Sequence, residues 1–331
     1  MRGDDTRHMR ELTGDRHGII RYEAVEAAGL IPELRAALAA GRVRRVRRGA
    51  YESTDATPGS PRERDALRYV RLVHAAAGAL QAPVFTGYSA MALYGLPIMG
   101  DWPTEVYVMS DGPHGRRRPG VISVARRSEV PLAMVEGVAV TAVEFSLIQL
   151  CRTAPLADAL AATDAAVRVD PFGRVPPLTT MDRLRAEHDR LRPYQGSRRT
   201  EAVLARAATG SESVLETASR LVFEEFGFAE PVLQHVVALP ELGRTARLDF
   251  YWPEADAAAE ADGRGKYRRD GVAESADTVI AEKDRENAIR RRVRAFDRWD
   301  WRDVRRRTPI EQRLEAMGVP RTRRPRPGLL L

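Results

Sequence analysis

The sequence predicts an α/β protein of the α+β, multi-domain type, and three observations support this prediction. The chain has 331 residues, which is long enough for two or three domains with separate cores. Helical patterns and strand-like runs are mixed along it. A run rich in Thr, Ser, Pro and Gly at 54–61 is typical of a linker. We expect domains at 13–53, 62–208 and 211–304, and a basic, disordered tail at 305–331.

The cysteine content and the hydropathy pattern both bear on cellular location. Cys151 is the single cysteine, which excludes an internal disulfide framework and is typical of a reducing compartment. No run approaches the roughly 18 apolar residues of a membrane span, and the residues from Met1 to Asp5 do not begin an apolar leader. We therefore expect a cytoplasmic protein that does not enter a membrane.

Basic residues are concentrated toward the C-terminal end of the chain. Residues 290–331 contain 14 Arg against 5 Asp and Glu, so residues 1–289 carry a net charge of about −2 within the formal total of +7. A basic stripe is typical of a nucleic-acid binder, and an Arg-rich solvated tail explains the same composition equally well. Among the 53 basic residues only Lys266 and Lys283 are lysines, whose pKa shifts on burial more readily than that of an arginine.

The segment 13–53 has the pattern of two short helices followed by a basic hairpin. Arg21–Ala28 is a short helical run that a glycine ends, and Pro32 begins a second helix that stops at Gly41. The run Arg42–Tyr51 is then expected to form a hairpin that carries five arginines. This order predicts a winged helix-turn-helix, and it resembles the N-terminal domain of abortive-infection type IV antitoxins.

A winged helix of this kind implies DNA as a partner. The helix at 32–40 would enter the major groove, with Arg35 as its base-reading candidate. The wing arginines would contact phosphates, and they are Arg42, Arg44, Arg45, Arg47 and Arg48. The alternative is a winged helix that mediates protein contacts and has a merely solvated wing.

The segment 62–208 predicts a mixed domain that serves as a scaffold or as a surface for a protein partner. Helical patterns occur at 62–80, 89–93, 142–151, 156–167 and 200–208, and strand-like runs at 105–109 and 120–124. The segment also resembles the continuation of the antitoxin-type protein, with Gly87-Tyr88-Ser89-Ala90 leading to Gly95-Leu96-Pro97. It contains no metal-spaced His or Cys cluster, phosphate-binding Gly loop or nucleophile elbow. We therefore interpret His74, His114 and His188 as ordinary histidines.

The segment 211–304 predicts strands between helices. A helix is expected at 211–226, with Ser213 and Glu216 spaced as a capping box. Strand-like runs follow at 232–239 and 247–252, and a long, highly charged helix at 277–296, whose Lys283, Arg285 and Arg292 would follow a DNA backbone. A final short strand would hold Trp299 and Trp301, whose rings we expect in the core.

Three carboxylates and an amine lie within eighteen residues of this segment: Asp249, Glu260, Asp262 and Lys266. Clustered carboxylates repel one another unless a cation lies between them. Side chains on a strand repeat with a period of two, so Glu260 and Asp262 on one strand can converge with Asp249 on its neighbour. Propensity alone favours a helix over 257–262, so the strand there depends on the resemblance described next.

The segment resembles the PD-(D/E)XK nuclease superfamily, and most closely its branch related to very-short-patch-repair endonucleases, which recurs in actinobacteria behind an antitoxin-like winged helix. The matching pieces are Ser211-Glu212-Ser213-x-x-Glu216, Pro231-x-x-Gln234, Arg247-Leu248-Asp249-Phe250 with Pro253, Glu260-x-Asp262-Gly263, Asp284-Arg285 and Trp299-x-Trp301. The resemblance implies a restriction-endonuclease-like mixed sheet flanked by helices and Mg²⁺-dependent hydrolysis of DNA. Two positions depart from the pattern, because Asp262 stands where the superfamily has lysine and Lys266 where the branch often has histidine.

The resemblance also assigns roles to residues. Asp249 and Glu260 would bind Mg²⁺, with Asp262 or Glu216 sharing the ion, and Lys266 would stabilise the phosphate. Gln234 would orient a water molecule or the substrate, and an edge-strand Gln without a role is the alternative. A surface salt bridge to Arg220 is the alternative for Glu216. The other function that fits is a non-enzymatic, antitoxin-type transcriptional regulator with a degenerate nuclease domain, and the missing lysine favours it.

Overall fold

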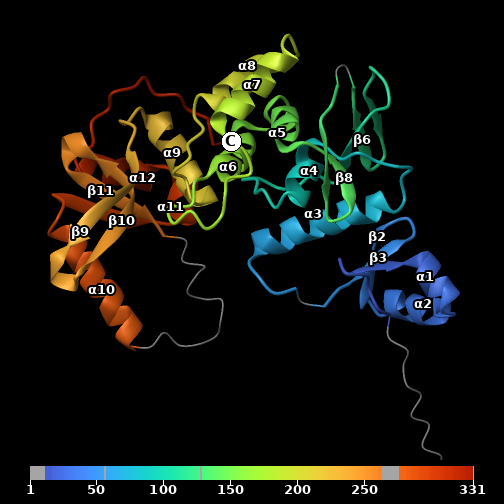
Figure 1. Ribbon diagram of the computed structural model, residues 1–331. Coiled ribbons are helices and arrows are strands. Elements are labelled where there is room, and N and C mark those ends of the chain that lie inside the picture. The colour runs from blue at the N-terminus through green and yellow to red at the C-terminus, as the bar shows by residue number, and fades with distance from the viewer. Residues whose placement is uncertain (1–11, 56, 127–128, 263–275, 331) are drawn as a thin grey trace, which may run out of the picture. The chain divides into compact units, whose positions relative to one another are not determined.

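The computed structural model describes residues 12–55, 57–126, 129–262 and 276–330 (Figure 1). The fold is mixed α+β, as expected, and its contacts divide the chain into two compact units. The first comprises Met1–Tyr94 and Trp102–Ala142, and the second Gly95–Asp101 and Val143–Leu331. This division cuts through the expected middle domain, because helix α6 of that segment packs against helix α9 of the C-terminal segment.

The first unit begins with the winged helix-turn-helix, whose elements are β1 (Ile19–Arg21), α1 (Tyr22–Ala27), α2 (Ile31–Ala39), β2 (Val43–Arg47) and β3 (Ala50–Ser53). The strands form an antiparallel sheet in the order β1-β3-β2. Ile20, Val25, Leu34 and Val43 are buried together between the helices and this sheet. Gly29 has a φ of 71°, a left-handed value that lets the chain turn sharply between the two helices.

The rest of the first unit consists of two helices and two small sheets. Helix α3 (Pro61–Ala77) begins at a complete capping box formed by Ser60 and Glu63, and α4 (Gly87–Leu93) follows. One sheet has the order β4-β6-β5 and the other is the hairpin β7-β8. Their strands are β4 (Val106–Met109), β5 (Arg116–Arg118), β6 (Val121–Val124), β7 (Leu132–Val135) and β8 (Val138–Thr141). Phe85 bridges to Val108 and to Val140, which joins the two sheets.

The second unit opens with four helices: α5 (Val143–Cys151), α6 (Leu156–Val167), α7 (Met181–Leu191) and α8 (Ser197–Leu204). Helix α6 is buried along almost its whole length and includes a buried carboxylate, Asp164. The Asp164 carboxylate accepts hydrogen bonds from Thr217 and from the Arg220 guanidinium, both at 2.8 Å. Arg220 is therefore engaged with α6, which disfavours the alternative of a surface salt bridge between Glu216 and Arg220.

A four-stranded mixed sheet forms the centre of the C-terminal segment. Its order is β12-β11-β10-β9, with β12 parallel to β11 and the other pairs antiparallel. The elements are α9 (Val214–Phe226), β9 (Val232–Leu239), β10 (Arg244–Trp252), β11 (Ala257–Ala261), α10 (Ala276–Arg290) and β12 (Ala295–Trp299). Phe223 of α9 packs edge-on against Phe250, Trp252 and Trp299. Ile289 of α10 packs with Leu248 and Phe296, so the expected mixed sheet with flanking helices is confirmed.

Two predicted elements differ from the structure near the end of this sheet. The helix expected at 277–296 stops at Arg290, and residues 295–299 form strand β12 instead. Ala295 and Phe296 of the expected helix fall in β12, which pairs with β11 along its whole length. Trp299 lies in β12 as expected, whereas Trp301 begins helix α11 (Trp301–Arg306) behind the Asp300 cap.

The segment 305–331, predicted to be disordered, is instead folded over the residues that the structure describes. It contains α12 (Thr308–Ala316), in which Ile310 and Leu314 are fully buried. The Arg307 guanidinium donates to Glu225 at 2.8 Å. Beyond the helix, Arg321 pairs with Phe228 in an isolated β-bridge and with Glu311 at 2.7 Å. The prediction failed because much of the apparent excess of positive charge is paired with acidic residues of the same unit.

Candidate nucleic-acid interface and carboxylate site

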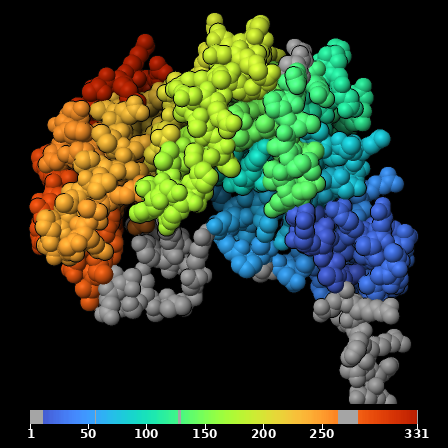
Figure 2. Space-filling view, in the orientation of Figure 1, coloured from blue at the N-terminus to red at the C-terminus, as the bar shows by residue number. Residues whose placement is uncertain are grey.

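The helix that would read DNA presents an exposed face. Leu34 and Ala37 turn inward to the core of the winged helix, and this orientation leaves Arg35 exposed on α2. The segment 13–53 is drawn in blue in Figure 2, which shows one of its faces. Arg35 therefore stands where the sequence predicted a base-reading side chain.

The five wing arginines are not equivalent. Arg44 is bound by Glu52 on the neighbouring strand, with its Nε and Nη2 both at 2.7 Å from Oε1. Glu52 is 2% exposed and also accepts from Arg71 at 3.1 Å. Arg47 is half-buried, and this burial lowers its pKa. Arg44 is exposed but paired with Glu52, and Arg47 is half-buried; the remaining wing arginines, Arg42, Arg45 and Arg48, are all exposed.

A row of polar side chains crosses the C-terminal sheet. Gln234 lies on β9, Asp249 on β10 and Glu260 on β11. On the β9 side, Leu248 pairs with His235 and Phe250 with Leu233, so Asp249 lies opposite Gln234. On the β11 side, Phe250 pairs with Ala259, so Asp249 lies opposite Glu260. Glu260 in turn pairs with Arg298 on β12. The convergence of Asp249 with Glu260 was expected from strand periodicity, and the register produces it.

Glu216 joins this row from the first turn of α9. The Ser213 hydroxyl caps the helix by accepting from the Glu216 N–H at 3.1 Å, as the expected capping box requires. The Glu216 carboxylate does not return to Ser213; its Oε2 accepts from the Glu212 N–H at 2.8 Å and from the Gln234 side-chain nitrogen at 3.0 Å. Burial, and next the nearby Asp249 charge, raise the pKa of Glu216 to about 7.

Asp249 shares the Gln234 amide with Glu216. The Gln234 nitrogen donates to Asp249 Oδ1 at 3.3 Å, and the Ala261 N–H donates to Oδ2 at 2.8 Å. Burial, with a contribution from the Glu260 charge, raises the pKa of Asp249 to about 6, although the Ala261 hydrogen bond opposes this shift. Gln234 has a positive φ of 53°, which is uncommon for a residue other than glycine and is often found at functional sites.

Glu260 is held by two arginines that the sequence analysis did not connect to it. Arg285 of α10 donates to Oε1 at 2.6 Å and to Oε2 at 3.2 Å. Arg298 of β12 donates to Oε2 at 3.0 Å from Nε and at 2.7 Å from Nη2. Arg285 was expected to follow a DNA backbone; in the described arrangement its guanidinium is paired with Glu260, and the DNA contact stays a prediction. We call Arg285 and Arg298 the arginine clamp.

The remaining predicted site residues lie around this cluster or outside the described residues. Asp262 follows β11, and its N–H donates to the Trp299 carbonyl at 2.8 Å. Lys266 lies outside the described residues. Lys283 is exposed on α10, whereas Arg292, also expected to meet DNA, is paired with Glu241 at 2.6 Å.

The donor set fits a divalent metal ion in part. Glu216 is buried and Asp249 is half-buried, the two carboxylates are linked through one amide group, and carboxylate oxygens are the ligands that Mg²⁺ prefers. Both Glu260 oxygens accept from the arginine clamp, and Oε1, which accepts one hydrogen bond, keeps a lone pair that an ion could use. Within the described residues, His17, His74 and Glu136 form a group whose ligand atoms all lie within 4.8 Å of one another. This group is separate from the carboxylates of the C-terminal sheet.

Comparison with known proteins identifies the N-terminal segment. Residues 7–54 match the family model described as "Transcriptional regulator, AbiEi antitoxin". This match confirms the resemblance predicted for that segment, and it makes the winged helix an antitoxin-like transcriptional-regulator domain. Within the part of the chain that the structure describes, no helix has the length and apolar character needed to cross a membrane.

Two curated mycobacterial proteins are similar over a longer stretch. They are Uncharacterized protein MT2308 of Mycobacterium tuberculosis strain CDC 1551 / Oshkosh and Uncharacterized protein Rv2248 of strain ATCC 25618 / H37Rv. Each is 30% identical over 177 residues, which cover 52% of this chain and 59% of the relative. The chain therefore spans about three fifths of the length of these relatives.

Proposed function

We propose that this protein is a DNA-binding regulator that contacts duplex DNA through its winged helix. The observation that carries the proposal is the antitoxin-like domain at 7–54, whose helix α2 exposes Arg35 beside a basic wing. The exposed wing arginines Arg42, Arg45 and Arg48 would bind phosphates and release counterions, while Arg35 would contact a base edge.

The salt dependence of binding tests this proposal. In fluorescence anisotropy with duplex DNA, the triple variant R42A/R45A/R48A should bind more weakly, and its slope against log salt should fall by about two to three units, roughly one for each lost contact. The matched control is R116A/R117A/R118A, which removes the same charge from the exposed strand β5 of the same unit. Equal slopes in the two triple variants would exclude the wing from the interface.

A second function is favoured by the buried carboxylates of the C-terminal unit. We propose that Glu216 and Asp249 hold a divalent metal ion with Glu260, and that the unit hydrolyses phosphodiester bonds. Such an ion would activate water and neutralise charge on the phosphate. The protein would contribute the carboxylates, the Gln234 amide that fixes their spacing, and the arginine clamp as a source of positive charge for a phosphate.

Cleavage of plasmid DNA with Mg²⁺, and with Mg²⁺ plus a chelator, tests the second function. Asp249→Asn should abolish cleavage and leave anisotropy with DNA unchanged, because the winged helix lies in the other unit. Asp182→Asn, at an exposed carboxylate on α7, is the control that should cleave like the unaltered protein. Cleavage that persists in Asp249→Asn would assign the activity to another site or to a contaminant.

A further inference from the structure

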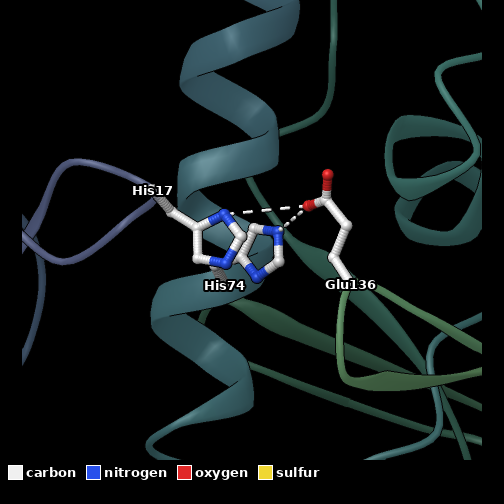
Figure 3. A group of neighbouring side chains, drawn as sticks. All are labelled: His17, His74 and Glu136. Carbon is white, nitrogen blue, oxygen red and sulfur yellow. Dashed lines mark hydrogen bonds and ion pairs between the residues drawn. The ribbon is translucent and has the colours of Figure 1, made fainter.

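Two histidines and one glutamate from separate elements of the first unit converge on one point (Figure 3). His17 lies in the turn that enters β1, His74 on α3, and Glu136 in the turn between β7 and β8. The His74 Nε2 lies 3.1 Å from Glu136 Oε2, and the His17 Nδ1 lies 3.7 Å from the same oxygen. Because all three ligand atoms lie within 4.8 Å of one another, the group has the dimensions of a metal site.

These separations match those of atoms bound to one small cation. Zinc binds imidazole nitrogen and carboxylate oxygen at about 2.0–2.1 Å, so two ligands of a tetrahedral zinc lie about 3.3–3.4 Å apart. The two distances to Glu136 Oε2 lie on either side of that value. The stacked imidazole rings would have to tilt so that both nitrogen lone pairs point at one ion, and two histidines with one glutamate form a known zinc set that leaves a fourth position open.

A hydrogen bond between His74 and Glu136 explains only part of this arrangement. The imidazole of His17 is stacked on that of His74, with 3.5 Å between the ring centroids and 14° between the planes. Both rings direct a nitrogen toward the same carboxylate, as Figure 3 shows. His74 is 3% exposed, whereas the Glu136 side chain is 54% exposed. An ion bound there would therefore have a buried ligand in His74 and would be reached from solvent on the Glu136 side.

Arg16 opposes the metal in the described arrangement. Its Nε–H donates to His17 Nε2 at 2.9 Å, which requires a lone pair on that nitrogen and leaves the proton of a neutral ring on Nδ1. A metal on Nδ1 requires the proton to move to Nε2, where it would face the guanidinium. Arg16 is exposed and can turn away, but it makes metal binding weaker than it would otherwise be.

We propose that His17, His74 and Glu136 form a binding site for a divalent transition metal ion of the Zn²⁺ type. Imidazole nitrogen favours zinc, cobalt, nickel or copper over Mg²⁺, so this site is chemically distinct from the carboxylate site of the second unit. The ion would tie the turn before β1 of the winged helix to α3 and to the β7-β8 turn. The site does not depend on whether either proposed function is correct.

Calorimetric titration of the full-length, chelator-treated protein with Zn²⁺ tests the proposal, with Co²⁺ absorption as a second readout. One ion should bind per chain, and His17→Ala and Glu136→Gln should each weaken binding by at least about tenfold. Both positions are accessible enough for these variants to fold, which circular dichroism would verify. Arg16→Ala should bind Zn²⁺ more tightly, an outcome that a merely structural histidine pair would not give.

Three controls separate this site from other ligands in the chain. His114→Ala and Asp249→Asn should bind Zn²⁺ like the unaltered protein, and so should His8→Ala, whose position lies outside the described residues. The proposal is overturned if no stoichiometric ion binds, if binding survives in both His17→Ala and Glu136→Gln, or if one of the controls loses it.

Discussion

Glu216 and Asp249 share a single amide group, because the Gln234 side-chain nitrogen donates to Glu216 at 3.0 Å and to Asp249 at 3.3 Å. Two carboxylates in so small a space repel each other when both are charged. One proton between them, or a cation, relieves this repulsion. The pair is therefore a place where pH and metal concentration should both change the stability of the protein.

We expect the free energy of unfolding to fall as pH rises from about 4 to about 7. In the folded protein Glu216 and Asp249 stay protonated to higher pH than in the unfolded chain. The reason is that burial, mainly, raises the pKa of Glu216 to about 7 and that of Asp249 to about 6. The stability that they contribute is thus fully present below the unfolded pKa values near 4 and is lost as pH passes through the folded ones. Glu216→Gln should flatten this fall in urea titrations across pH. Glu254→Gln, at an exposed side chain of the same unit, is the control, and an equally steep fall in both variants would contradict the assignment.

Asp249→Asn should change the response to Mg²⁺ as well as the stability. Without metal the variant should melt at the same or a higher temperature, because one charge of the repelling pair is gone. The increase in melting temperature that Mg²⁺ gives to the unaltered protein by mass action should disappear. Thermal scans with and without Mg²⁺ measure both effects. A full Mg²⁺ response in the variant would place the metal elsewhere.

Loss of one arm of the arginine clamp should destabilise the second unit. Arg298→Met removes one of the two arginines that pair with Glu260, which is 8% exposed. We expect the free energy of unfolding to fall by about 1–3 kcal/mol. This is less than for a fully buried ion pair, because the Arg298 side chain is partly exposed. Adding Glu260→Gln should recover part of this loss, since the unpaired charge is removed. Urea denaturation measures both. Arg185→Met, from an exposed pair with Asp182, should cost less than about 0.5 kcal/mol.

The segment after Arg306 should contribute to folding and not act as a free tail. Leu314 is fully buried on α12, so Leu314→Ala should lower the free energy of unfolding by about 2–4 kcal/mol. Leu132→Ala, at a side chain that is 57% exposed, is the matched control and should have little effect. Equal stability of the two variants would restore the view that this segment is disordered.

Local periodicity predicted the elements well where one face of an element is buried. Strand β9 has the bounds Val232–Leu239 expected from its sequence, and helix α6 spans the expected 156–167. Strand β11 agreed with the prediction although its alanine-rich sequence favours a helix, because neighbours on both sides supply its hydrogen bonds. Helix α7 and the β7-β8 hairpin were missed: α7 is mostly charged and buries only Leu184 and His188, and the two strands of the hairpin have four residues each.

Contacts between distant residues could not be predicted in the same way. Asp249 and Glu260 were placed together because they are eleven residues apart on adjacent strands. The arginine clamp joins Glu260 to residues 25 and 38 positions away, and no local pattern indicates that pairing. His74 was interpreted as an ordinary histidine, yet it lies against His17 and Glu136, which only the tertiary fold brings to it.

The parallel pairing of β12 with β11 also orders the events of folding. Strands β9, β10 and β11 follow one another along the chain and can assemble as successive hairpins. Strand β12 can join only after the connection through α10 has crossed to the far side of β11, a slower step because it closes a long loop. We therefore expect Gln234, Asp249 and Glu260 to come together before Arg298 pairs with Glu260.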